Sequence, residues 1–107
     1  VKPGQPAFDE ELFGPVAAIS SVKNWQEAVE LSNQSEFGLG GAIFSKNLQL
    51  AEEIATTELE VGSAFINSFV KSDSRLPFGG VKNSGLGREL GLSGLYEFAN
   101  LKTVYLG

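Results

Sequence analysis

The segment Pro77–Gly91 constrains the fold of this chain more than any other, because it holds five glycines in fifteen residues between bulky and charged side chains. A flexible Gly/Ser linker carries no such large residues. Glycine adopts positive φ angles in tight turns and allows the backbone to approach other atoms closely. We therefore expect a fixed backbone path that leads into a helix.

Two common phosphate-binding patterns fail within this segment, each at one residue. The dinucleotide pattern G-x-G-x-x-G begins at Gly85 and Gly87 but meets Leu90 where its third glycine belongs. The P-loop pattern fails because Leu86 occupies the position of its essential lysine. A phosphate-binding loop is therefore not the role we expect for these glycines.

The charged and aromatic residues of the segment leave alternatives open. Arg88 and Glu89 are either solvated or paired with the end of a neighbouring helix. Phe78 follows a proline and precedes two glycines, so it is either part of the core or directed into a pocket. Spacing alone does not choose between these two positions.

Upstream of this segment, short apolar runs alternate with amphipathic helical patterns. A helix is predicted after Asn24, whose side-chain oxygen precedes Glu27 by three residues as in a capping box, and a second helix from Asn47. The expected strands are Val16–Val22, Ala42–Phe44 and Val61–Asn67. This alternation predicts a βαβαβ arrangement with a parallel sheet, and hence the α/β fold class.

Two further elements are expected near the C-terminus. A short helix is predicted around Leu92–Ala99, followed by an apolar, β-prone tail, Leu101–Leu106. At 107 residues the chain is at most one domain. A domain of this size typically buries roughly 60–70% of its unfolded surface.

Composition excludes several functional classes. A net charge of −5 argues against nucleic acid or an anionic membrane as the main partner. Without cysteine or histidine there is no thiolate nucleophile, no Ser-His pair and none of the usual structural zinc ligand sets, so no metal site is expected. The chain shows neither a signal peptide nor an apolar run of about 20 residues, and we expect a cytoplasmic protein. It also lacks methionine, so we expect a processed or excised chain.

The acidic stretch Glu10–Pro15 also has two interpretations. The simpler one is a solvated acidic pair that precedes a Gly-Pro turn and a strand. The other uses Glu11 and Phe13 together, because a carboxylate can accept two sugar hydroxyls while an aromatic ring two residues away packs against the same ligand. The stretch alone does not decide between them.

Three motifs, in this order and spacing, resemble the aldehyde dehydrogenase superfamily. They are Glu-Glu-Leu-Phe-Gly-Pro at 10–15, Phe-Ile-Asn at 65–67, and Pro-Phe-Gly-Gly-x-Lys-x-Ser-Gly-x-Gly-Arg-Glu at 77–89. The resemblance covers essentially the whole chain. The amino-acid sequence of Ser72–Phe78 and its surroundings is most similar to that of bacterial succinate-semialdehyde dehydrogenases.

The resemblance implies a C-terminal portion of such an enzyme. Residues 1–83 would form part of the catalytic domain, residues 84–100 the end of the glycine segment and a C-terminal helix, and residues 101–107 an oligomerisation strand. Family members run to about three domains, which is far more than this chain supplies. The implied assembly is a homo-oligomer, in which the last strand pairs with a neighbouring subunit's sheet.

The resemblance also implies a reaction, the NAD(P)-dependent oxidation of an aldehyde to a carboxylate. In this family a cysteine thiolate attacks the aldehyde, hydride passes to the nicotinamide, and a glutamate activates the water that hydrolyses the resulting thioester. The chain contains no cysteine. We therefore assign no catalytic residue and expect this chain alone to be inactive.

Four positions match functional residues of the family. Glu11 matches the carboxylate that holds the nicotinamide ribose hydroxyls, and Phe13 matches the aromatic residue near that ring, so both are predicted to bind NAD or NADP. Phe78 matches the aromatic residue beside the aldehyde. Ser72 falls where many members place an aromatic wall of the substrate tunnel, and its hydroxyl would suit the carboxylate of succinate semialdehyde.

Two functions of other classes stay open. One is a non-catalytic, acidic α/β module that binds or regulates a partner. The other is a self-association module driven by exposed apolar surface and the C-terminal strand.

Overall fold

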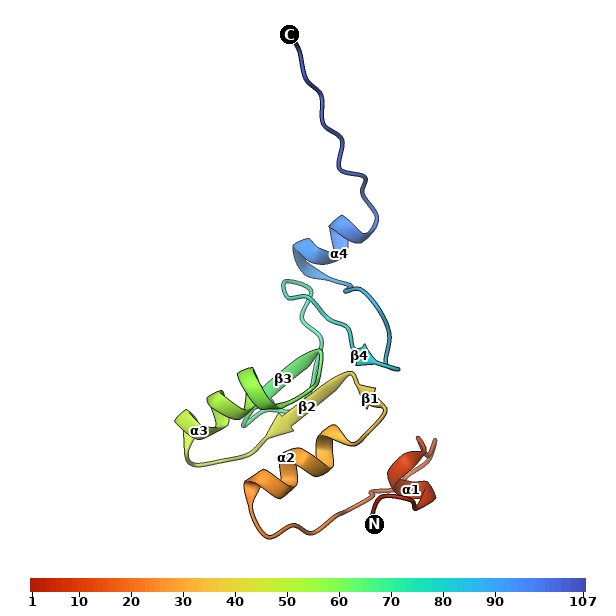
Figure 1. Cartoon of the computed structure of the whole chain (residues 1–107), viewed down its shortest axis with the longest axis vertical. Coiled ribbons are helices and arrows are strands. Elements are labelled where there is room, and N and C mark those ends of the chain that lie inside the picture. The colour runs from red at the N-terminus through yellow and green to blue at the C-terminus, as the bar shows by residue number, and fades with distance from the viewer.

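The computed structural model describes all 107 residues and shows an elongated chain (Figure 1). Its principal extents are 65 × 33 × 22 Å and its radius of gyration is 17.4 Å. A compact domain of this length would have a radius of gyration of about 13 Å. Most helices and strands gather at the N-terminal end of the long axis, while the C-terminal tail runs away from them.

The centre of the structure is one βαβ unit, whose two strands are parallel as predicted. Strand β2 (Gly40–Ile43) lies parallel to β3 (Ser63–Ile66), from the pair Gly40 and Ser63 to the pair Ile43 and Ile66. Helix α3 (Leu48–Glu53) connects them and continues as a π-helical turn, η1 (Ile54–Glu58). Ala51 and Ile54 on this connection are the buried hydrophobic residues of the chain, so the core sits between helix and sheet.

Two threonine side chains bond back to the helix at the π-helical turn. The Thr56 hydroxyl donates to the Glu52 carbonyl at 2.7 Å, and the Thr57 hydroxyl donates to the Glu53 carbonyl at 2.8 Å. Back-bonding of this kind slightly destabilises and often bends a helix, and it coincides here with the change from α3 to the π-helical turn. Here the wide turn ends the helix and sends the chain toward β3.

Helix α2 (Trp25–Asn33) begins as predicted. The Asn24 side-chain oxygen accepts a hydrogen bond from the Glu27 backbone N–H at 2.8 Å. The Glu27 carboxylate accepts from the Lys23 N–H at 2.7 Å instead of from Asn24, so the reciprocal bond is shifted by one residue from the usual capping box.

The predicted strand Val16–Val22 is wrong, and the structure therefore has one βαβ unit in place of βαβαβ. A strand exists only where a second strand satisfies its backbone groups, and none lies beside this run. Its contacts are instead with the first residue, because the Val1 amino group donates to the Ile19 carbonyl and the Ser20 hydroxyl donates to the Val1 carbonyl. A short helical turn, α1 (Pro6–Asp9), which the sequence did not predict, precedes the run.

The glycine segment forms its own small sheet with the chain after α2. Strand β1 (Phe37–Gly38) pairs antiparallel with β4 (Val81–Lys82). Helix α4 (Gly91–Glu97) follows, close to the predicted Leu92–Ala99 but ending two residues earlier. The tail from residue 101 forms no strand within the chain, and Leu101 and Leu106 are each 94% exposed.

The chain buries less surface than we expected. Its accessible surface is 8561 Å², whereas a compact monomer of 11.4 kDa would expose about 5,800 Å². Folding thus buries about half of the unfolded surface, and the sequence-based expectation of 60–70% is wrong. No helix in the chain is both long and apolar enough to span a bilayer.

Candidate functional site

The glycine segment follows a fixed path, as its composition predicted. Phe78 and Glu89 exchange two backbone hydrogen bonds, each 2.7 Å from nitrogen to oxygen, which close the intervening residues into a loop. Gly85 and Gly87 lie inside this loop with φ angles of 132° and 69°, values that favour glycine. The Arg88 guanidinium donates to the Gly80 carbonyl at 2.8 Å, so this side chain ties the loop to itself.

Phe78 lies at a cavity, which favours the second of its two interpretations. It is half-buried and lines a cavity of about 240 Å³ beside β3. The other lining residues are Gly62–Phe65, Lys71, Asp73, Leu76 and Pro77. The backbone bonds to Glu89 fix the main chain of Phe78, and the residue contributes to the wall of a cavity that a small ligand could enter.

Ser72 lies beside this cavity without lining it. Its two neighbours, Lys71 and Asp73, both line the cavity, whereas Ser72 is exposed. Its predicted role at the substrate stays a prediction. Ser72 is therefore adjacent in sequence to two residues of the cavity that Phe78 lines.

Glu11 and Phe13 lie elsewhere, in the N-terminal arm after α1. Glu11 lines a larger cavity of about 740 Å³ together with Phe8, Trp25 and Phe37. Phe13 lines neither this cavity nor the one at Phe78, and it is 93% exposed. The two cavities share no residue, so this chain does not assemble the four predicted residues into one site.

Asp73 and Arg75 form the one pronounced electrostatic feature near the smaller cavity. The Arg75 Nε donates to Asp73 Oδ1 at 2.9 Å, and Arg75 Nη2 donates to Oδ2 at 2.6 Å. These bonds, with one from the Arg75 backbone N–H, lower the pKa of the Asp73 carboxyl from 3.8 to about 2 and raise the pKa of Arg75. Asp73 is therefore an anion already paired with a cation at neutral pH.

The titration of Asp73 tests this geometry. Because its folded pKa lies below its unfolded value of 3.8, the pair contributes stability above pH 3.8, and that contribution is lost as pH falls toward 2. We expect a ¹³C-detected carboxyl titration with a midpoint near 2, and a return toward 3.8 in Arg75→Gln. Lys46→Gln removes a charge elsewhere and should leave the midpoint low. A midpoint near 3.8 in the unsubstituted chain would contradict the pairing.

Sequence profiles of known families identify the chain. The profile of the aldehyde dehydrogenase family matches residues 1–104. The chain belongs to the aldehyde dehydrogenase family. The match includes all four predicted site residues, and it confirms the resemblance drawn from the three motifs.

Individual family members show how much of an aldehyde dehydrogenase this chain represents. It is 51% identical to a succinate semialdehyde dehydrogenase [NAD(P)+] of Escherichia coli, over 98% of this chain and 22% of that protein. It is 50% identical to a succinate-semialdehyde dehydrogenase [NADP(+)] of Deinococcus radiodurans, over 97% of this chain and 22% of the relative. The chain thus spans about a fifth of the length of the curated relatives it matches.

Solved aldehyde dehydrogenases share its fold. The succinic semialdehyde dehydrogenase of Streptococcus pyogenes, solved with NADP+, is 43% identical with a TM-score of 0.92, over 99% of this chain and 23% of that one. The betaine aldehyde dehydrogenase of Staphylococcus aureus, solved with NAD+, is 44% identical with a TM-score of 0.80, over 84% of this chain and 18% of that one. The mixed helix and sheet of this chain is therefore that of the corresponding part of the family.

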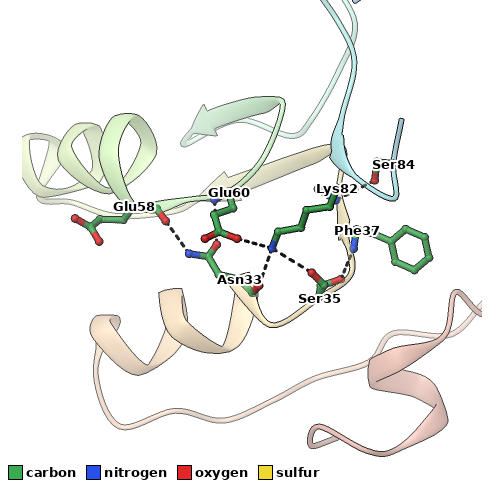
Figure 2. A network of polar contacts seen from close by, with 8 residues as sticks. Asn33, Ser35, Phe37, Glu58, Glu60, Lys82 and Ser84 are labelled. Carbon is green, nitrogen blue, oxygen red and sulfur yellow. Dashed lines mark hydrogen bonds and ion pairs between the residues drawn. The ribbon is translucent and has the colours of Figure 1, made fainter. Parts of the chain in front are cut away.

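The sequence pattern assigned no role to Lys82, which the structure places in a dense polar network (Figure 2). Its ammonium meets oxygens from two other parts of the chain. The sequence did contain one signal for Lys82. It is the only basic residue before Arg88 in the glycine segment. Its partners were not predictable, because two of them are backbone carbonyls nearly 50 positions upstream.

Proposed function

We propose that this chain acts as part of an NAD(P)-dependent aldehyde dehydrogenase that oxidises succinate semialdehyde to a dicarboxylate. The observation that carries the proposal is the family match over residues 1–104, together with 51% identity to an enzyme of that name. The dinucleotide would accept the hydride that leaves the aldehyde carbon, and water would supply the second carboxylate oxygen.

Glu11 and Phe13 are proposed to bind the dinucleotide. A carboxylate only accepts hydrogen bonds, and it suits a pair of ribose hydroxyls, which donate them. Glu11 lines the larger cavity, where a sugar has room, and the exposed ring of Phe13 is free to pack against a planar ligand. These residues fit the nicotinamide half of NAD or NADP, and they do not distinguish the two cofactors.

Phe78 and Ser72 are proposed to contact the aldehyde. Phe78 would pack against the carbon chain of the substrate from the wall of the smaller cavity, and the Ser72 hydroxyl would donate to its carboxylate. The charge of the surroundings supports a carboxylated aldehyde, because Lys71 lines the cavity while the negative charge of Asp73 is paired with Arg75. Lys71 and Arg75 together give two cations near the single anion Asp73, and this excess of positive charge favours an anionic substrate.

The reaction is proposed to require polypeptide beyond this chain. The thiolate chemistry of the family needs a cysteine, which this sequence does not contain, and the cavities at Glu11 and Phe78 are separate here. Residues 1–83 would complete a catalytic domain formed with other segments. Residues 101–107 would pair with the sheet of a partner subunit, which would give their exposed backbone hydrogen-bond partners.

An assay of the longer polypeptide tests the proposal. We expect it to reduce NAD or NADP with succinate semialdehyde about tenfold more efficiently than with butyraldehyde, since a hydrogen bond to a charged group contributes about 1.5–3 kcal/mol. The 107-residue chain alone should reduce neither cofactor. The measurement is absorbance at the wavelength of the reduced nicotinamide. Equal rates with both aldehydes would contradict the substrate, and turnover by the isolated chain would contradict its dependence on other segments.

A further inference from the structure

The ammonium of Lys82 joins three segments of the chain that are distant in sequence (Figure 2). Its Nζ donates to the Asn33 carbonyl at 2.6 Å and to the Ser35 carbonyl at 3.1 Å, and it lies 2.7 Å from Glu60 Oε2. An ammonium has three N–H groups, so these three oxygens satisfy it completely. The Lys82 side chain is 25% exposed and that of Glu60 is 57% exposed, so the ammonium is partly shielded from solvent while its carboxylate partner is not.

Asn33 organises the oxygens that Lys82 meets. Its Nδ2 donates to the Glu58 carbonyl at 2.7 Å, and its Oδ1 accepts from the Glu60 N–H at 3.0 Å. The last residue of α2 is thereby fixed to the chain that follows η1. The negative end of a helix dipole also favours a cation at this position.

The backbone of β4 shows that Lys82 is held under constraint. Its φ angle is 53°, in the left-handed region that lysine rarely occupies. Immediately after Lys82 the chain is bound to β1 and the residue before it, with the Asn83 N–H donating to the Glu36 carbonyl at 3.0 Å and the Gly38 N–H donating to Ser84 Oγ at 2.9 Å. Such a conformation persists only where the surroundings impose it, and the Lys82 side chain supplies the contacts to α2 and Glu60.

Only Gly79, Gly80 and Val81 separate this anchor from Phe78. On the other side of the loop, Phe78 is bonded to Glu89, and Arg88 bonds the Gly80 carbonyl. The backbone at Phe78 is therefore held from both sides, through residues 88–89 on one side and through the paired segment 81–84, to which Lys82 adds its side-chain contacts, on the other. Two adjacent glycines beside Phe78 would let the loop change direction if the contacts on the second side were lost.

We propose that Lys82 is a positioning residue, which aims Phe78 at the aldehyde by anchoring the glycine segment to the end of α2. The role of Phe78 at the substrate is part of the proposed function, so this inference rests on it. Lys82 itself touches neither substrate nor cofactor. It acts on the reaction through the orientation of the loop between residues 78 and 82.

Lys82→Met in the longer enzyme tests this anchor, because methionine keeps most of the apolar stem and removes the ammonium. We expect the KM for succinate semialdehyde to rise about tenfold, since small misplacements of a positioning group have large effects, while the KM for the dinucleotide stays unchanged. Hydrogen exchange at the Phe78 and Glu89 amides should accelerate. Lys23→Met, at an exposed lysine before α2, is the matched control and should change neither quantity.

Two further variants separate positioning from general destabilisation. Glu60→Gln keeps a hydrogen-bond acceptor but removes the charge, so it should give a smaller change of the same kind, and it serves if Lys82→Met does not fold. If Lys82 acts through Phe78, adding Lys82→Met to Phe78→Ala should raise the aldehyde KM no further than Phe78→Ala alone. Additive effects would overturn the proposed coupling.

The exchange data distinguish failure of the anchor from failure of the proposed function. Unchanged exchange at Phe78 and Glu89 in Lys82→Met would overturn the anchor, whatever the kinetics. A fall in kcat alone, with unchanged aldehyde KM, would indicate loss of folded enzyme and would also overturn it. Faster exchange with no change in aldehyde KM for either Lys82→Met or Phe78→Ala would overturn the aldehyde role of Phe78, and with it the positioning role.

Discussion

Gly62→Ala should destabilise the folded enzyme by about 3 kcal/mol, because the new methyl group has no space to occupy. A Cβ at Gly62 would lie 1.8 Å from the Gly79 carbonyl oxygen and 2.9 Å from the Gly80 Cα. Both are backbone atoms, which cannot rotate aside as the end of a side chain can. Either the start of β3 or the glycine segment would have to move.

Urea unfolding of the longer enzyme measures this effect. We expect a lower midpoint with an unchanged m-value, since the substitution strains the native state and leaves the extent of unfolding the same. Gly14→Ala is the matched control, because a Cβ at Gly14 meets nothing within 4 Å. If the two variants unfold at the same urea concentration, the close packing of β3 against the glycine segment is incorrect.

The same substitution carries information about the aldehyde site. Gly62 lines the smaller cavity beside Phe78, so a shift of the glycine segment would move the ring as well. We expect any Gly62→Ala enzyme that still folds to bind the aldehyde less tightly. The effect on the dinucleotide should be smaller, since Glu11 lies at a different cavity.

Glu11→Gln should lower kcat/KM for the dinucleotide about tenfold or more in the longer enzyme. Glutamine retains the size of the side chain and one acceptor oxygen but loses the charge, and hydrogen bonds to a charged group contribute about 1.5–3 kcal/mol. The measurement is initial rate against NAD or NADP concentration at saturating aldehyde. The aldehyde KM should change little, because the proposed contact is with the ribose.

Glu10→Gln provides a closely matched control for this prediction. Glu10 is adjacent, lines the same cavity and undergoes the same loss of charge, but the proposed ribose contact is with Glu11 alone. Equal effects of the two substitutions would indicate a general electrostatic field instead of a specific contact. Unchanged kinetics in Glu11→Gln would remove that residue from the site.

Helices with local signals were predictable from the sequence, whereas a strand was predictable only where its connection to the next strand restricted the pairing. Helix α2 was predicted because its signals, Asn24 at the cap and apolar residues at helical spacing, lie within the helix itself. The run Val16–Val22 has an equally good strand composition, but a strand needs a neighbour, and the structure gives it none. The parallel pairing of β2 and β3 was correct because their connecting helix restricts the geometry.

The candidate site also contains residues that the sequence identifies and contacts that only the structure reveals. The identities of Glu11, Phe13, Phe78 and Ser72 came from motifs, which preserve residue type and order along the chain. The contacts of Lys82 came only from the structure, because they depend on backbone oxygens brought together over 47 and 49 positions. No side-chain pattern marks a carbonyl oxygen as a partner. Positioning residues of this kind are therefore harder to find from sequence than residues that contact a ligand.

The interior of this chain has an unusual consequence for which substitutions it tolerates. Four residues are buried, and two of them, Gly38 and Gly80, have no side chain. A Cβ at Gly38 would lie 2.6 Å from the Glu60 carbonyl oxygen, and one at Gly80 would lie 2.4 Å from the Ser84 Cβ. Backbone atoms contribute to the obstruction at both positions, the Glu60 carbonyl oxygen at Gly38 and the Ser84 carbonyl group at Gly80, so a smaller neighbouring side chain would free only part of the volume. Substitution at Gly38 and Gly80 should therefore be limited more by the lack of space for a Cβ than by a requirement for hydrophobicity.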